Sequence, residues 1–143
     1  MAYLTVQELL IRFPAEDTFN LINDDQSIVF ADVAWGEEDD PTVSKLKSIL
    51  STSSNFMDGF FTSYTLPFSV LPPILKQICF FVVIYNLFSR KILTDIPKSV
   101  SDNYNIALGL LNNISNGSLS LFTNSPGSLL SSYTDINIMD IVV

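Results

Sequence analysis

Hydrophobic residues recur at steps of three and four through most of the chain, which is the spacing of α-helices. The first such stretch begins after Thr5, which is followed three residues later by Glu8, and this spacing predicts a capping box at the start of a helix. Pro14 ends that helix. A second short helix is predicted over residues 16–22, so the chain opens with two short helices.

Three longer helices follow and form the main body of the predicted fold. Over residues 42–60 the apolar positions repeat for about five turns. Residues 74–88 are apolar on nearly every face, which is typical of a helix surrounded by others. Arg90 and Lys91 follow it, where they can interact with the negative end of its dipole. A third amphipathic helix is predicted over residues 100–114.

The pattern is less decisive between and after the helices. Residues 28–31 fit either a short extended piece or the start of a helix. Asn116-Gly117 predicts a left-handed cap at the end of the last helix. Residues 136–143 partly alternate between apolar and polar, which indicates a strand. A single strand has no partner in a helical chain, so this segment either frays or adds to another element, such as one of a neighbouring copy.

The segment of residues 62–73 is a long proline-containing loop. It holds Pro67, Pro72 and Pro73, and prolines at this density forbid a helix. If water surrounded the loop, it would expose several large apolar side chains, namely Tyr64, Leu66, Phe68, Val70 and Leu71. We therefore expect the loop to pack against something.

These elements predict a mostly all-α fold. It is a small bundle of three main helices with short N-terminal helices, the proline loop and an extended C-terminal tail. The expected organisation is one helical domain over residues 1–121 and a C-terminal extension over residues 122–143. A chain of 143 residues is long enough to bury a core without disulfides or metals.

The charge balance restricts the partners. Seven Lys and Arg face 15 Asp and Glu, so the formal net charge is −8, which opposes binding to nucleic acid phosphates. Charged residues make up 15% of the chain, where about 25% is ordinary, and the mean hydropathy is +0.35. Either other chains cover part of the surface, or the core is larger than usual. Residues 77–89 carry no charge but number 13, short of the roughly 20 of a membrane span.

The residue types exclude most catalytic and metal chemistry. The chain has no His, so Ser-His-Asp and Cys-His systems are excluded, and Cys79 lies in an apolar run where a thiol is expected to be buried. Asp24-Asp25 and residues 37–40 do not have the spacing of a calcium loop, and the five Gly form no phosphate loop. Phe30 and Trp35 are expected to pack in the core. We predict no catalytic residue, no cofactor, no metal and no small-molecule substrate.

Several segments resemble one known family. The most specific lie around the proline loop, at Asp58-Gly59-Phe60, Tyr64-Thr65-Leu66-Pro67-Phe68 and Pro72-Pro73-Ile74-Leu75. Shorter ones lie near the N-terminus, at Met1-Ala2-Tyr3 and Arg12-Phe13. Others follow in the helices, at Tyr85, Leu87, Pro97, Val100, Tyr104, Ala107, Leu111, Ile114, Gly117 and Leu119. Over about residues 1–121 the chain resembles the Mu-like bacteriophage family of small virion proteins.

The resemblance implies a structural role without catalysis. This family resembles the helical head-to-tail connector, or head completion, proteins, whose small subunits form a ring beneath the portal and join the DNA-filled head to the tail. The implied partners are further copies of the chain, the portal and tail proteins, with no sequence-specific nucleic acid and no membrane. The implied location is the virion, and the bacterial cytoplasm before assembly. The alternative is a cytosolic adaptor of phage origin that binds a protein through the apolar loop.

Two groups of residues are predicted to carry the connector role. The first is expected to pack across the subunit or portal boundary and consists of Tyr64, Leu66, Pro67, Phe68, Leu71, Pro72 and Pro73. The competing interpretation is that this loop folds back onto its own helices. The second group is expected to face the channel and to repel passing DNA, and consists of Glu37, Glu38, Asp39 and Asp40. The competing interpretation is that these acids only keep the protein in solution.

Overall fold

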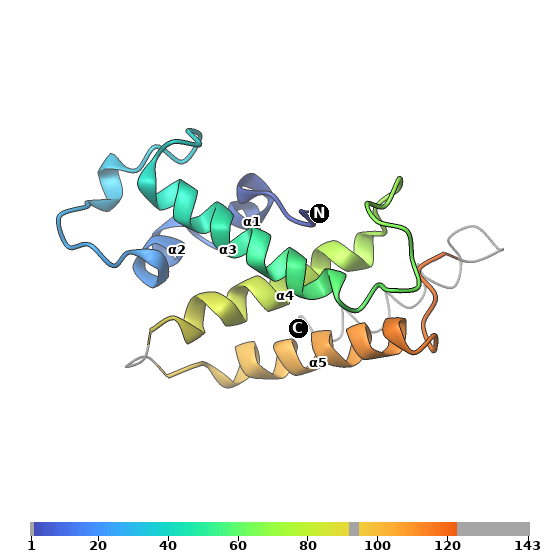
Figure 1. Cartoon of the computed structure of the whole chain (residues 1–143). Helices are drawn as coiled ribbons and strands as arrows, with labels where there is room; N and C mark the ends of the chain where they lie inside the picture. Colours follow the sequence, from blue (N-terminus) through green and yellow to red (C-terminus); the bar gives the residue numbers. More distant parts are fainter. Residues whose placement is uncertain (1, 92–94, 123–143) are drawn as a thin grey trace.

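The computed structural model describes residues 2–91 and 95–122, and this part of the chain is helical without any strand (Figure 1). The predicted all-α fold class is confirmed. In chain order the elements are α1 (Val6–Arg12), α2 (Ala15–Ile22), the 3-10 turn η1 (Phe30–Asp32), α3 (Pro41–Asp58), α4 (Pro73–Ser89) and α5 (Lys98–Ser115). The segment whose conformation the sequence left open therefore contains a 3-10 turn. The predicted strand at residues 136–143 lies outside the described residues.

The helix ends have local causes in the sequence. At α1, the Glu8 amide donates to Thr5 Oγ1 and the Thr5 amide donates to Glu8 Oε1, both at 3.1 Å, so the predicted capping box is confirmed. At α3, Asp40 Oδ1 accepts from the Thr42 amide at 2.9 Å. After α5, Gly117 has a φ of 85°, which confirms the predicted left-handed cap. The sequence thus specifies where these helices begin and end.

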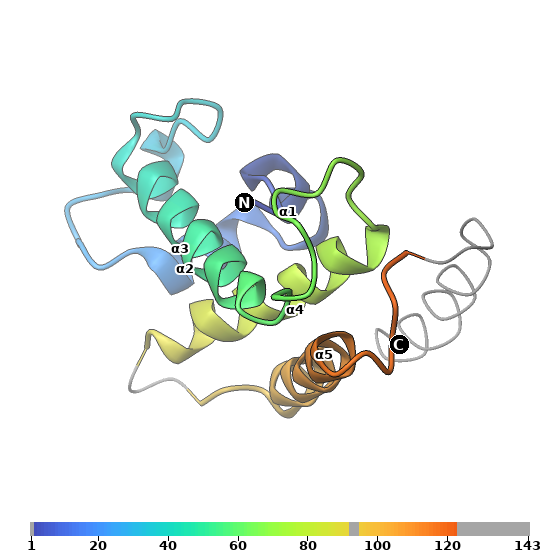
Figure 2. The ribbon, with the colours of Figure 1, turned by 45° about the vertical axis from the view of Figure 1, so that its right-hand side comes forward.

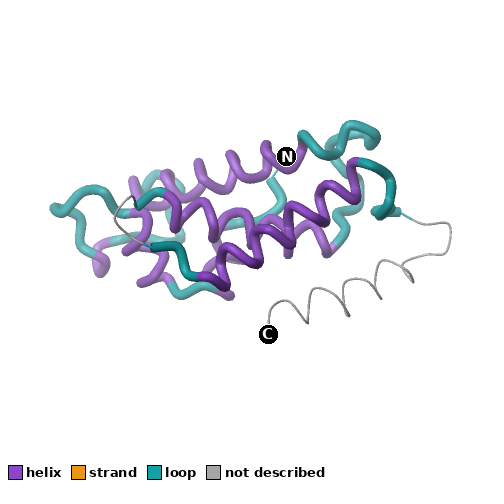
Figure 3. Tube along the Cα trace, turned by 90° about the horizontal axis from the view of Figure 1, so that it is seen from below, coloured by secondary structure: helices purple, strands orange, loops and turns teal. Residues whose placement is uncertain are grey.

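The three long helices lie side by side with α4 in the centre. The chain runs from one end of the molecule to the other along α3, returns along α4 and runs out again along α5 (Figures 1 and 3). Helix α4 packs against α5 on one side and α3 on the other, while α1 and α2 lie against α3 (Figure 2). The central position of α4 explains why it is apolar on nearly every face.

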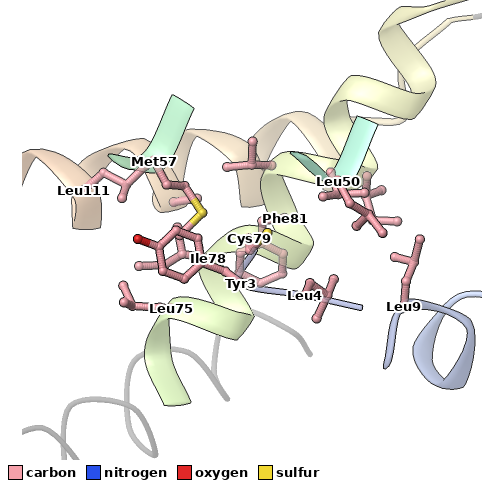
Figure 4. Close-up of a cluster of buried hydrophobic side chains, with 14 of the residues drawn as sticks. Tyr3, Leu4, Leu9, Leu50, Met57, Leu75, Ile78, Cys79, Phe81 and Leu111 are labelled. Carbon is pink, nitrogen blue, oxygen red and sulfur yellow. The ribbon is translucent and has the colours of Figure 1, made fainter. Parts of the chain in front are cut away.

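The core is centred on α4. Ile78, Cys79, Val83 and Leu87 of this helix are fully buried, and Figure 4 shows side chains from the N-terminus, α3 and α5 gathered around its first half. Burying an aliphatic side chain of this size contributes roughly 1.5–3 kcal/mol. The buried position of Cys79 confirms its predicted place in the core, and the burial raises the pKa of its thiol to about 11. Burial therefore favours the protonated form of this thiol, which is a poor nucleophile.

A ring stack and a hydrogen bond fix how the helices meet around this core. Between α4 and α5, the rings of Tyr85 and Tyr104 stack with centroids 3.9 Å apart and planes 11° from parallel. Between α3 and α4, Asn86 Nδ2 donates to Ser53 Oγ at 2.9 Å. Such contacts specify one arrangement of the helices where apolar packing alone would allow several.

Arg90 and Lys91 bind a different helix from the one predicted. Arg90 Nη1 donates to the carbonyl oxygens of Leu21 (3.0 Å) and Ile22 (3.2 Å), at the end of α2. Lys91 Nζ donates to the carbonyl oxygen of Asn23 at 2.8 Å. These cations therefore satisfy the free carbonyls of α2, and they fasten α2 to the end of α4.

Candidate protein interface

Phe68 holds the proline loop on the body of the protein. Its side chain is 9% exposed, and its ring lies 5.6 Å from that of Phe61, 5.8 Å from that of Tyr64 and 6.4 Å from that of Tyr3, measured between centroids. Edge-to-face and tilted pairs at such distances are favourable beyond the area that they bury. This part of the loop folds back onto its own chain.

The same loop also contacts the segment after α5. The Leu121 amide donates to Tyr64 Oη at 3.1 Å, and the ring of Phe122 lies 5.9 Å from that of Phe68 and 6.2 Å from that of Tyr64. Two segments about 55 residues apart in the sequence thereby form one surface. We call residues 59–73 together with residues 115–122 the uncharged end, because they contain no Asp, Glu, Lys or Arg.

The seven predicted interface residues divide into supporting and outward-facing ones. Phe68 and Pro72 are buried and support the loop from inside. Tyr64, Leu66 and Leu71 are half-buried, and Pro67 and Pro73 are exposed. The two most exposed apolar residues of this end are Val70 (69% exposed), which the sequence placed among the apolar residues of the loop but not in the predicted interface, and Phe122 (48% exposed), which the sequence did not indicate. The signal that could have indicated both residues is the absence of charge over residues 59–73 and 115–122.

The opposite end of the molecule is acidic. Residues 16–40 contain nine of the fifteen acids and no Lys or Arg. They form α2, η1 and the approach to α3, on the left in Figure 1, while the uncharged end is on the right. The protein therefore separates an acidic end from an end that carries no charge.

The four predicted channel acids do not act as one group. Asp40 caps α3 and also accepts from the Ala34 amide at 3.0 Å, and these backbone hydrogen bonds lower the pKa of its carboxyl. Glu38 accepts from Lys47 Nζ at 2.8 Å, which lowers the pKa of Glu38. Glu37 and Asp39 are exposed. Their channel-facing role stays a prediction.

The comparison with protein families shows to which family the chain belongs. Residues 3–134 match the family model described as Bacteriophage Mu, Gp36. The chain belongs to the bacteriophage Mu Gp36 family. The resemblance read from the proline loop and the later helices is thus confirmed at the level of a Mu-like phage family, and the match runs past residue 121 to residue 134. No curated protein matches the chain.

The family match includes both parts of the uncharged end and the whole acidic segment. The described residues of this Mu Gp36 family member bring no three His, Cys, Asp or Glu side chains into a group that could bind a metal ion. Among the described helices, none combines the length and the apolar character that crossing a bilayer requires.

Asp24 has a structural role that the sequence did not predict. Its carboxylate accepts from Arg90 Nη2 (2.6 Å), from Lys45 Nζ (3.1 Å) and, more weakly, from Lys91 Nζ (3.5 Å). The hydrogen bonds from Arg90 and then Lys45 lower the pKa of Asp24 to about 2. In this member of the Mu Gp36 family, Asp24 therefore joins the loop after α2 to α3 and to the end of α4. No local pattern reveals it, because its partners are distant in the sequence.

Proposed function

We propose that this protein is a structural subunit without catalytic activity that joins the head of a phage particle to its tail. In this role it contacts the portal, a tail protein and further copies of itself in a ring. Membership of a phage protein family supports the general part of the proposal, namely that this is a phage protein. The observation that supports the specific role, a connector that contacts other proteins, is the uncharged end.

The composition of the uncharged end fits a contact surface between proteins. The centres of such interfaces are depleted in charged residues and enriched in aromatic ones. Val70 and Phe122 protrude there, while Phe68 holds the loop from inside, so the surface is preformed and little conformational entropy is lost on binding. Leu66, Pro67, Leu71 and Pro73 extend the same surface.

The acidic end has a separate role in this proposal. In a ring whose contacts use the uncharged ends, Glu37 and Asp39 face the channel and keep DNA from adsorbing to its wall, because like charges repel. The double variant Glu37→Gln, Asp39→Asn keeps the cap of α3 and the uncharged end, so the joined particles that it forms should release DNA more slowly. DNA release at the unchanged rate would remove this part of the proposal.

The connector role is tested by the particles that form without the protein. Disruption of the gene should leave DNA-filled heads and separate tails, seen by electron microscopy, because each part assembles but the junction is missing. Complementation with the unaltered chain should restore joined particles, and complementation with Val70→Asp should not, since it places a charge in the centre of the proposed contact. Joined particles in the disrupted strain would refute the role and favour a cytosolic adaptor.

A further inference from the structure

A second surface feature lies away from the uncharged end, between the first residues of the chain, α1 and α3. It is a groove of about 450 Å³, within the range of about 300–1,000 Å³ for sites that hold ligands. Leu4, Val43 and Leu50 form its floor, and the indole of Trp35 lines one side. The floor residues are 2–4% exposed, so the groove opens directly onto the outer layer of the core. We call it the N-terminal groove.

The rim of the N-terminal groove is acidic. Glu37 and Glu38 lie on it, and the one cation among the described lining residues, Lys47, is already paired with Glu38. Glu37 makes no side-chain hydrogen bond or ion pair within the described part of the chain. The rim therefore keeps an excess negative charge above an apolar floor, and this combination favours an occupant that is both apolar and cationic.

We propose that the N-terminal groove binds a short segment of a partner protein in which a large apolar side chain is flanked by Lys or Arg. The apolar side chain fills the space above Leu4, Val43 and Leu50, and the cation pairs with Glu37 at the rim. When the groove is occupied, Glu37 is no longer available to face a channel.

Another copy of this chain fits the groove poorly. Six of its seven cations already have a described contact. Lys45, Lys47, Lys76, Arg90 and Lys91 are in ion pairs, and the Arg12 guanidinium lies 4.0 Å from the centre of the Phe80 ring. Only Lys98 is left without one among the described residues, and it is the first residue of α5, with Pro97 before it and Ser99 after it. The cationic, apolar segment therefore belongs to a different protein.

Binding can be followed directly because Trp35 is the only tryptophan of the chain. The intact protein is titrated with acetyl-Lys-Leu-Leu-Lys-amide while Trp35 emission is recorded, and with acetyl-Glu-Leu-Leu-Glu-amide in parallel. The basic peptide should shift the emission saturably, with an affinity that falls as salt is added, whereas the acidic peptide should not. Replacing the leucines of the basic peptide by serine should weaken binding about tenfold or more.

Two matched variants connect this signal to the groove. Ser51 is exposed and lines the groove, so Ser51→Phe should fill it and abolish the response. Ser48 is exposed on the same helix but does not line the groove, so Ser48→Phe should respond like the unaltered chain. Glu37→Gln with Glu38→Gln should weaken binding of the basic peptide about three- to tenfold.

The results separate this proposal from its alternatives. The absence of a saturable response to the basic peptide, or the same response from Ser51→Phe and Ser48→Phe, would overturn the groove as a site. Equal binding of the basic and acidic peptides would overturn the proposed charge of the occupant. The uncharged end takes no part in this experiment, so failure here leaves the proposed connector role standing.

Discussion

Replacement of Phe68 by alanine tests whether the proline loop is anchored on its own helices. Removing a buried Phe side chain typically costs 3–5 kcal/mol, and each aromatic pair adds about 0.5–1.5 kcal/mol to what burial alone gives. Phe68 is 9% exposed and its ring meets four others within the described part of the chain, but it borders the surface, where the loop can close part of the space that is left. We therefore expect a loss of about 3 kcal/mol, toward the lower end of this range.

Val70 provides the matched control within the same loop. Its side chain is 69% exposed, so Val70→Ala should change stability by less than about 0.5 kcal/mol. Equilibrium unfolding in urea, followed by far-ultraviolet circular dichroism, measures both variants, and equal slopes against urea show that the same structure unfolds. A loss below about 1 kcal/mol for Phe68→Ala, or equal losses for both variants, would show that the loop is not held as described.

Other positions test the remaining structural statements. Arg90 and the other cations depress the pKa of Asp24, so the stability that they provide is present above about pH 5 and is lost as the pH falls through 4 toward 2. Asp24→Asn should cost about 1 kcal/mol at pH 7 in urea unfolding, a value reduced for the exposure of the carboxylate. The cost should be only a small part of this at pH 2, where the carboxyl is largely protonated in the unfolded state and about half protonated in the folded state, and an equal cost at both pH values would contradict the ion pairs. Gly117→Ala should lower stability by about 1 kcal/mol in thermal unfolding, because the φ of Gly117 is positive. Gly109 lies inside α5 with open space around an added Cβ, so Gly109→Ala should raise stability by about 0.5–1 kcal/mol. The same sign for both glycines would refute this assignment.

Local chemistry made the fold predictable. The capping box at Thr5 and the cap at Gly117 are signals contained within a few residues, and both have their predicted role in the structure. Helix α4 is apolar on nearly every face, and this predicted that other helices surround it. Helix type and order therefore followed from the spacing of apolar residues together with local caps and prolines.

The candidate site was only partly predictable, because its contacts join distant parts of the chain. The prolines excluded a helix in the loop, but they did not reveal that Phe68 faces inward and Val70 outward. That division depends on Phe61, Tyr3 and Phe122 meeting in space. In the same way, both interpretations of the acids of residues 37–40 treated them as one group, while in the structure they divide among a helix cap, an ion pair and a groove rim.

The central claim is that this protein is part of the phage particle. Phage induced from the source strain is purified, and the chain is quantified in the particles by mass spectrometry against the portal protein. The account predicts a fixed, small number of copies per particle, retained when loosely bound protein is washed away with high salt. Complete, infectious particles that lack the chain would contradict it.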